Sequence, residues 1–442
     1  MTPAHEIAHP QPSFGEFFSA FARIGVLSFG GPAAQISLMH RICVDEKRWI
    51  RDDRFLHALN YCMLLPGPEA QQLATYIGWL MFGVRGGIIA GLLFVLPGLL
   101  VILGLSAAYA LFQQTDWLTG LFFGLKAGVL AIVVQAVIRL ASRALKTRFH
   151  RIIALLAFVA LFFLSLPFPL VVLSAGLAGL AMIRLKGDAP TANADTDAPA
   201  PRVNLLRSVA ALVFWILVWQ APLLILMALG SPEGLAAPFA FFSKMALVTF
   251  GGAYAVLAYV AQVVVEQYQW LQPGEMLDGL ALAETTPGPL VLVLSFVGFM
   301  AAYRDAGGLD PVVAGLLGGL LTAWATFVPS FIWIFAGAPY IERLRGNRWL
   351  SAALSAITAA VVGVIFNLTL WFGLHVLFKR VETVSPLPGL DISWPDWASI
   401  DLLSLAIFIV AAVLLFRFRL GVEKLLALSA ATGMMLFMAR LV

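Results

Sequence analysis

The chain has 442 residues, of which 61% are hydrophobic and only 12% are charged, and its mean hydropathy is +0.92. Soluble globular proteins carry about 25% charged residues, so this composition excludes a soluble enzyme or a soluble binding domain. Several uncharged runs reach the roughly 20 residues that a helix needs to cross a bilayer. The clearest are residues 86–112, 208–230, 311–340 and 349–378. We therefore predict an all-α, polytopic membrane protein embedded in a lipid bilayer.

The formal net charge is +4. Basic loops at a membrane surface explain it, and we expect no nucleic-acid partner. The two cysteines, Cys43 and Cys62, fit no disulfide framework or zinc motif. No cluster of His, Cys and carboxylates has the spacing of a metal site, so we expect no metal and no cofactor. No cleavable signal is expected either, because the N-terminus lacks a basic stretch followed by an apolar one.

Residues 1–13 form a polar tail, and residues 14–186 form the first of two predicted units. This unit opens with two apolar segments, residues 14–38 and 55–84, each of which is interrupted by Gly and Pro. Each half of these segments has only about 10–16 residues, too few to cross a hydrocarbon layer of about 30 Å at 1.5 Å per residue. We therefore expect broken or re-entrant half-helices at these places.

Longer apolar runs complete the first unit. Residues 86–112 are followed by residues 117–138 and 152–183, and the last run carries Leu166-Pro167-Phe168-Pro169 at its centre. Proline interrupts helices, so residues 152–183 should form a tight helical hairpin.

A composition change separates the two units. Residues 187–203 are rich in Ala, Pro and Asp and have no apolar period, which predicts a disordered linker. Residues 204–230 should form a single connecting transmembrane helix. Residues 231–442 form the second unit, in which residues 239–260 and 276–303 are again interrupted by Gly or Pro.

The two units repeat the same landmarks. Phe29-Gly30-Gly31 recurs as Phe250-Gly251-Gly252, Trp49 as Trp270, and Pro66-Gly67-Pro68 as Pro287-Gly288-Pro289. The offset is 221 in each case (250 − 29, 270 − 49 and 287 − 66). Later landmarks, such as Pro97 and Pro329, are offset by 232 (329 − 97). The chain is therefore predicted to be two copies of one unit.

Loop charges predict that the second copy is inverted across the membrane. Residues 41–54 contain five Lys or Arg, whereas the equivalent residues 262–275 contain none and two Glu. Two further pairs of equivalent loops show the same reversal, and basic loops remain cytoplasmic. The connecting helix supplies the odd crossing that inversion requires. We predict about nine full transmembrane helices plus four re-entrant elements, although broken helices that span obliquely are an alternative.

Interrupted segments at matching positions of two inverted halves are the best sequence indication of a transporter's binding site. Half-helices that begin after Gly-Pro breaks expose backbone N–H groups and partial positive charge, which hold anions. The same breaks could instead serve close helix packing. The residues that we expect to bind an anionic substrate are Arg23, Ser28, Phe29, Gly30, Gly31, Pro32, Pro66, Gly67, Pro68, Lys126, Lys244, Thr249, Gly251, Gly252, Thr286, Pro287, Gly288 and Pro289.

Basic and hydroxyl side chains near the breaks support an oxyanion site. Arg23 aligns with Lys244 at offset 221, and Ser28 aligns with Thr249. A cation beside a hydroxyl and free amides suits an oxyanion, but Arg23 and Lys244 could also extend to the membrane surface. Lys126 lies inside an apolar run, where a charge is a candidate for function.

Two carboxylates beside the proline motifs, Glu69 and Glu284, are candidates for proton coupling, because burial favours their protonated form. Alternatives for Glu69 are pairing with a helix N-terminus, with Arg23 or with Lys126. Gln71 and Gln72 could line a polar path.

The motifs Phe29-Gly30-Gly31-Pro32 and Pro66-Gly67-Pro68, with their echoes, resemble the signatures of the chromate ion transporter family in its long, two-domain form. The resemblance implies a multi-pass protein of the bacterial inner membrane that exports chromate, with sulfate as a related oxyanion and the proton motive force as the driver. It also allows a homodimer. The second copy departs from the motif, because Ala253 stands where the first copy has Pro32.

We expect alternating access between the two units, with the oxyanion near the membrane midplane. An oxyanion channel is an alternative, because re-entrant half-helices also build pores; so is a transporter of another anion such as sulfate. A membrane enzyme would need a clustered acid/base or metal constellation. The sequence offers none, and we predict that the protein is not an enzyme.

Overall fold

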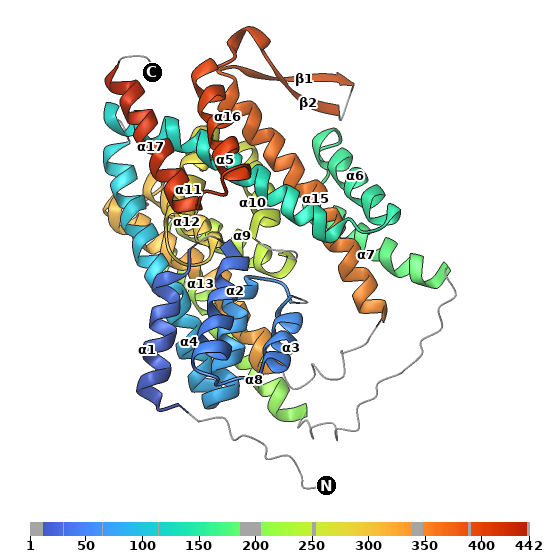
Figure 1. Ribbon diagram of the computed structural model, residues 1–442. Coiled ribbons are helices and arrows are strands. Elements are labelled where there is room, and N and C mark those ends of the chain that lie inside the picture. Colours follow the sequence, from blue (N-terminus) through green and yellow to red (C-terminus); the bar gives the residue numbers. More distant parts are fainter. Residues whose placement is uncertain are drawn as a thin grey trace.

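The computed structural model describes residues 12–29, 31–63, 65–113, 115–185, 205–249, 253–337, 348–387 and 390–439, and within them it is nearly all helical (Figure 1). The predicted linker at residues 187–203 lies outside the described residues, as do Gly30, Gly251 and Gly252.

The first unit is built from short helices followed by long ones. In chain order they are α1 (Phe14–Leu27), α2 (Gly31–His40), the π-helical turn η1 (Arg41–Glu46), α3 (Asp52–Cys62), α4 (Glu69–Phe112), α5 (Asp116–Ala144), α6 (Arg148–Phe162) and α7 (Phe168–Leu185). As the prolines predicted, residues 152–183 form a hairpin, which turns between α6 and α7.

The rest of the chain starts with the connecting helix α8 (Leu205–Ala228). The second unit contains α9 (Glu233–Val248), α10 (Ala253–Gln262), the π-helical turn η2 (Val263–Gln267), α11 (Pro273–Thr285), η3 (Leu290–Leu292), α12 (Val293–Arg304), α13 (Pro311–Gly337), α15 (Arg348–Leu377), η5 (Trp397–Ser399), α16 (Leu402–Phe416) and α17 (Val422–Met438).

The helices break at the Gly/Pro motifs. α1 ends at Leu27, and α2 begins at Gly31, whose φ is 79°. The central glycines of the two Pro-Gly-Pro motifs, Gly67 and Gly288, have φ of 112° and 92°. Glycine adopts such angles without steric cost, whereas other residues are strained by them. The glycines therefore set where each short helix stops and the next one starts.

After the first break the chain folds back on itself. Arg23 near the end of α1 forms an ion pair of 3.5 Å with Glu46 of η1. The chain also reverses within α4, where Phe82 and Gly83 have non-helical angles.

Glycines let the two arms of α4 approach closely. A Cβ atom on Gly78 would clash with the carbonyl oxygen of Gly86. The second unit repeats this packing, because a Cβ atom on Gly318 of α13 would clash with the carbonyl oxygen of Gly298 of α12. Small residues permit such backbone contact between membrane helices.

The two units share local structure at offset 221. The π-helical turns η1 and η2 occupy equivalent positions. The N–H of Trp49 donates to the carbonyl of Cys43 at 2.9 Å, and the N–H of Trp270 donates to the carbonyl of Val264 at 2.9 Å. The residue before each tryptophan has a positive φ, 52° in one unit and 54° in the other. In Figure 1 the first unit's α1, α2 and α3 lie below the second unit's α10 and α11.

The C-terminal helices of each unit pack on the long helix of the other. α6 and α7 pack against α15, while α16 and α17 pack against α5 (Figure 1). Glycines again permit backbone contact, because Cβ atoms on Gly124 and Gly179 would clash with the carbonyls of Ser429 and Ala352. The two units are therefore interlocked rather than side by side.

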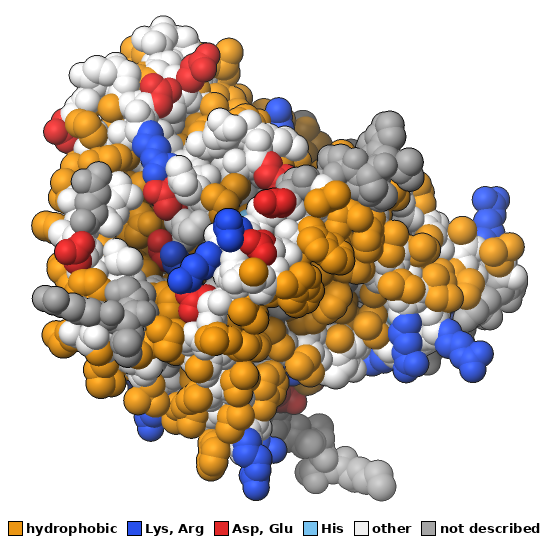
Figure 2. Space-filling model, turned by 90° about the horizontal axis from the view of Figure 1, so that it is seen from above, with side chains coloured by type: hydrophobic (Ala, Val, Ile, Leu, Met, Phe, Trp, Pro, Cys, Tyr) orange, Lys and Arg blue, Asp and Glu red, His pale blue; other side chains and the backbone are white. Residues whose placement is uncertain are grey.

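Six of the described helices are long and apolar enough to cross a membrane: α4, α5, α7, Val209–Ala228 of α8, α13 and α15. The expectation of about nine crossings remains a prediction, since α6, α16 and α17 have only 15, 15 and 17 residues. Large apolar side chains are exposed on many helices, and apolar side chains cover much of the face in Figure 2. This surface suits lipid contact, so the chain is a multi-pass membrane protein.

One element departs from the predicted all-α fold. β1 (Val381–Leu387) and β2 (Leu390–Pro395) form an antiparallel hairpin between α15 and α16, with Glu382 opposite Trp394. The sequence here includes several β-branched and aromatic residues, which favour strands. The hairpin joins the ends of two apolar helices and does not alter the helical core.

Candidate functional site

Two reciprocal hydrogen bonds join the units at their Gly/Pro motifs. The N–H of Gly288 donates to the carbonyl oxygen of Ser28 at 2.7 Å, and the N–H of Gly67 donates to the carbonyl oxygen of Thr249 at 2.8 Å. Gly67 and Gly288 are equivalent at offset 221, as are Ser28 and Thr249 (288 − 67 and 249 − 28). Such an exchange, in which residue i contacts j and j contacts i, is typical of two-fold packing. Each Pro-Gly-Pro motif therefore docks on the end of the other unit's first helix.

The hydroxyl groups of Ser28 and Thr249 are used within their own helices. Ser28 Oγ donates to the carbonyl of Ile24 at 2.6 Å, and Thr249 Oγ1 donates to the carbonyl of Met245 at 2.5 Å. The hydroxyl of Thr286 likewise donates to the carbonyl of Ala283. In this conformation these expected anion donors are committed to backbone carbonyls.

A narrow cavity lies where the motifs meet. Its lining residues are Pro32, Gln35, Pro68, Glu69, Ala70, Pro289, Leu290 and Val291. Its volume of about 10 Å³ is room for about one water molecule. The starts of α2, of α4 and of the helical stretch Leu290–Arg304 all contribute to its wall. The first N–H groups of a helix have no partner within the helix, so three partly positive helix ends converge on this cavity.

Glu69 is the charged residue of this wall. It is the first residue of α4, so it lies in the first turn of that helix. A carboxylate near a helix N-terminus is stabilised by the partial positive charge there, so an ionised Glu69 and an external anion compete for the same helix end. Glu284, the other predicted carboxylate, is buried in α11 but does not belong to the cavity lining.

Three buried glutamines surround the motifs, all from the first unit. The Nε2 of Gln35 donates to the carbonyl of Gly288 at 2.7 Å, and that of Gln72 donates to the carbonyl of Pro66 at 2.7 Å. The Nε2 of Gln71 donates to the carbonyl of Phe327 at 3.3 Å. The Oε1 atoms of all three have no partner among the described residues.

The second unit carries apolar residues at the corresponding positions: Val256, Leu292 and Val293. The polar side chains of the site therefore come from one unit. Sequence reasoning pointed to Gln71 and Gln72 but missed Gln35. A polar residue three positions after Pro32, in an otherwise apolar stretch, was the available signal.

The three predicted cations do not line this cavity. The side chain of Arg23 is 55% exposed and pairs with Glu46, and Lys244 is exposed on α9. Lys126 lies 3.0 Å from Asp278 Oδ1. Glu69 is thus paired with neither Arg23 nor Lys126, which removes two of the alternatives considered for it.

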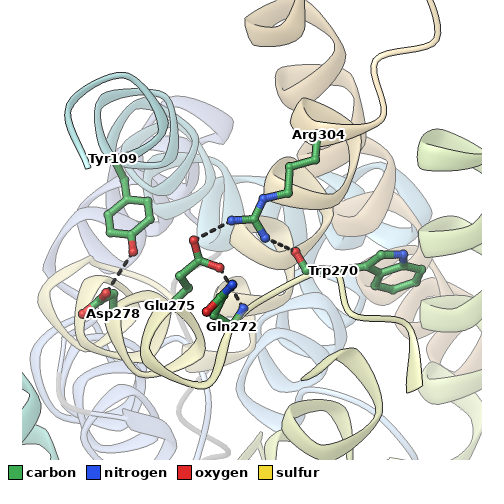
Figure 3. Close-up of polar contacts among 6 residues, drawn as sticks. All are labelled: Tyr109, Trp270, Gln272, Glu275, Asp278 and Arg304. Carbon is green, nitrogen blue, oxygen red and sulfur yellow. Dashed lines mark hydrogen bonds and ion pairs between the residues drawn. The ribbon is translucent and has the colours of Figure 1, made fainter. Parts of the chain in front are cut away.

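A second polar group surrounds Asp278 (Figure 3). The hydroxyl of Tyr109 donates to Asp278 Oδ2 at 2.9 Å. Glu275, one turn earlier on α11, forms an ion pair with Arg304 of α12, and Arg304 also donates to the carbonyl of Trp270. Sequence reasoning pointed to Lys126 but missed its partner Asp278 and the residues around it. A carboxylate inside the apolar run 276–303 was its one visible sign.

Comparisons with known proteins agree with the motifs. The profile of a family described as "Chromate transporter" matches residues 15–180 and 236–436, that is, both units. The "Chromate transport protein" of Pseudomonas aeruginosa is 32% identical, with 86% of this chain and 86% of that protein covered. The protein of the same name from Cupriavidus metallidurans is 27% identical, with 97% of this chain and 95% of that protein covered.

A "Probable chromate transport protein" from Synechococcus elongatus is 28% identical, with 87% of this chain and 91% of that protein covered. These relatives are named as transport proteins rather than enzymes, and no solved structure matches the chain. The chain belongs to the chromate transporter family.

Proposed function

We propose that this protein is a secondary transporter of the bacterial inner membrane that exports chromate, and that the cavity between the interrupted helices binds the anion. The observation that carries the proposal is the convergence of three helix N-termini on one cavity at the contact between the units. Free N–H groups at helix ends bind oxyanions without a metal or a cofactor. Sulfate has the same charge and shape as chromate and is the related substrate to test. The names of the relatives support chromate as the substrate.

The transport mechanism is alternating access between two inverted units. The reciprocal bonds of Gly67 and Gly288 support a two-fold relation between the units, and the reversed loop charges support an axis in the membrane plane. The cavity holds about one water, and an anion with four oxygens is larger. In this proposal the structure represents a closed conformation, and the units separate at the Pro-Gly-Pro motifs to admit substrate.

Proton coupling acts through Glu69 in this proposal. The ionised carboxylate competes with the oxyanion for the N-terminus of α4, whereas the protonated carboxyl does not repel the anion. Glu284 is a second candidate, because it is buried one turn before Pro287. Arg23 and Lys244 attract the anion from the protein surface and do not coordinate it directly.

Oxyanion uptake into inverted membrane vesicles tests the proposal. We expect chromate uptake to saturate and to depend on a proton gradient. Sulfate should inhibit this uptake more strongly than molybdate does. Uptake that does not saturate and ignores the proton gradient would indicate an oxyanion channel. The absence of any chromate flux in vesicles that contain folded protein would contradict the proposed function.

A further inference from the structure

Lys126, Asp278 and Tyr109 form a polar triad that the anion cavity does not include. Lys126 Nζ lies 3.0 Å from Asp278 Oδ1, and the hydroxyl of Tyr109 donates to Asp278 Oδ2 at 2.9 Å. The side chain of Asp278 is 8% exposed, whereas that of Lys126 is 26% exposed. The carboxylate is thus inside the protein, and its cation approaches it from the more open side.

The triad crosses the contact between the two units. Lys126 and Tyr109 come from α5 and α4 of the first unit, and Asp278 comes from α11 of the second. A movement that separates α11 of the second unit from α5 of the first would stretch or break the Lys126–Asp278 pair. A buried carboxylate left without its cation is strongly disfavoured. Asp278 must then gain a proton, or the movement does not occur.

The other charges around Asp278 are already compensated. Glu275 on the same helix pairs with Arg304 of α12, which also donates to the carbonyl of Trp270 (Figure 3). Within the described residues, the charged and titratable groups that act on Asp278 are therefore Lys126, Tyr109 and the neutralised Glu275. Lys126 is the cation whose departure would change the charge state of Asp278.

The triad has a defined place relative to the cavity. Asp278 lies seven residues before the end of α11 at Thr285, about 10 Å along the helix at 1.5 Å per residue. The segment after α11 leads directly to Pro289 of the cavity wall. The equivalents of Asp278 and Lys126 in the other unit are His57 and Thr358 (278 − 221 and 126 + 232). The Lys126–Asp278 pair is thus not repeated at the equivalent positions, and this asymmetry suits a directional process.

We propose that Asp278 is a proton-binding site that couples proton movement to oxyanion movement, with Lys126 as the group that exchanges partners. When the Asp278 carboxylate binds a proton from the adjacent aqueous side, it becomes neutral and Lys126 loses its partner. The free ammonium of Lys126 then attracts the incoming oxyanion. When the anion leaves, the proton is released on the same side and the ion pair forms again. One proton thus accompanies each divalent anion, and the one remaining negative charge lets a membrane potential that is negative inside drive export. This inference rests on the proposed transport function and adds a coupling site to it.

Proteoliposomes that contain the purified full-length protein separate coupling from transport. Chromate–chromate exchange at equal pH needs no net proton movement, whereas accumulation driven by a pH gradient does. We expect D278N to retain exchange within about threefold of wild type and to lose at least tenfold in pH-driven accumulation. K126Q should raise the KM for chromate in exchange, because it removes the attracting charge. D278E should restore part of the pH-driven accumulation, because it keeps a titratable carboxylate.

A double variant of the exposed pair Arg51–Asp53, R51Q/D53N, is the matched control and should behave as wild type in both assays. If wild type shows neither exchange nor accumulation, the proposed function fails. If wild type shows both and D278N accumulates chromate as well as wild type does, only the coupling site is overturned. Loss of exchange in a folded D278N protein also overturns it, since that result assigns the triad a structural role.

Discussion

The amide nitrogen Nε2 of Gln35 lies 2.7 Å from the carbonyl oxygen of Gly288, which belongs to the other unit. The N–H of Gly288 in turn donates to the carbonyl of Ser28. Both polar backbone groups of this one glycine are thus held by the first unit. The second Pro-Gly-Pro motif is fixed from both sides, and the cavity wall depends on that fixation.

Replacing Gln35 by Leu should weaken transport and stability together. The change leaves the carbonyl of Gly288 buried without its side-chain donor, which lowers the free energy of unfolding by about 1–3 kcal/mol. We expect a lower Tm in detergent and a higher KM for chromate in exchange. The matched control is Gln135→Leu on α5, because Gln135 accepts a hydrogen bond from the exposed Arg139 four residues away on the same helix. Equal effects of the two substitutions would show that the Gln35–Gly288 bond has no special role.

The glycines of the Pro-Gly-Pro motifs should not tolerate a side chain. Gly288 has a φ of 92°. Gly288→Ala forces alanine into this strained backbone conformation, which lowers the free energy of unfolding by on the order of 1–3 kcal/mol. We expect chromate uptake to fall at least tenfold, because the motif forms the cavity wall. Gly104→Ala in α4 is the control, since a Cβ atom there meets open space and φ is not positive. Wild-type uptake by Gly288→Ala would rule out a fixed motif geometry.

Glu69→Gln should remove the competition between carboxylate and anion at the N-terminus of α4. We expect wild type to bind chromate more weakly in exchange as the pH rises and Glu69 ionises. Glu69→Gln should reduce this pH dependence and leave the part that comes from protonation of Asp278. Glu284→Gln is the informative comparison, because Glu284 does not line the cavity. If Glu284→Gln rather than Glu69→Gln reduces the pH dependence, the competing carboxylate is Glu284.

The interruptions were predictable from the sequence because backbone conformation is a local property. Gly31, Gly67 and Gly288 adopt positive φ, and a glycine beside proline in an apolar run usually marks the end of a helix. The repeat was visible for the same reason, since both copies need glycine at the same turn. The hairpin between α6 and α7 followed from its prolines.

Side-chain partners were not predictable, because they depend on which helices meet. Asp278 lies 152 positions after Lys126 (278 − 126) and reaches it only through the packing of α11 on α5. Arg23 aligned with a candidate site but faces the surface, where Glu46 returns to it after the chain folds back. The β-hairpin was missed because its strands are short and lie between two strongly apolar helices.

His40 should make stability depend on pH. Its Nε2 lies 2.7 Å from Asp52 Oδ1, and Asp45 is 3.4 Å from Nδ1. The hydrogen bond to Asp52 and the charge of Asp45 raise the pKa of His40 above its usual value. The protonated form therefore stabilises the fold fully below about pH 6.5, and this contribution is lost as the pH rises through the raised pKa.

Thermal unfolding of wild type and His40→Gln over a pH series measures this effect. We expect wild type to exceed His40→Gln in Tm at low pH and the difference to shrink as the pH rises. The corresponding difference in the free energy of unfolding should be below about 1 kcal/mol, because Asp45 and Asp52 are largely exposed. A constant difference across the series would show that protonation of His40 does not contribute.

The inverted arrangement predicts that the two equivalent loops face opposite sides of the membrane. Cysteines placed by Arg51→Cys and Gln267→Cys should be labelled from opposite sides by a reagent that does not cross the bilayer. The background should be low, since burial raises the pKa of the Cys43 thiol to about 12 and only the thiolate reacts. Cys62 is buried as well.

The two loops are equivalent, because each carries the same π-helical turn and the same tryptophan contact. We expect Arg51→Cys to be labelled in inverted vesicles and Gln267→Cys in intact cells. This result would establish a two-fold axis in the membrane plane. The unmodified protein, which has only the two buried cysteines, is the control. Labelling of both positions from one side would contradict inversion. The reciprocal Gly67 and Gly288 contacts would then require a two-fold axis along the membrane normal.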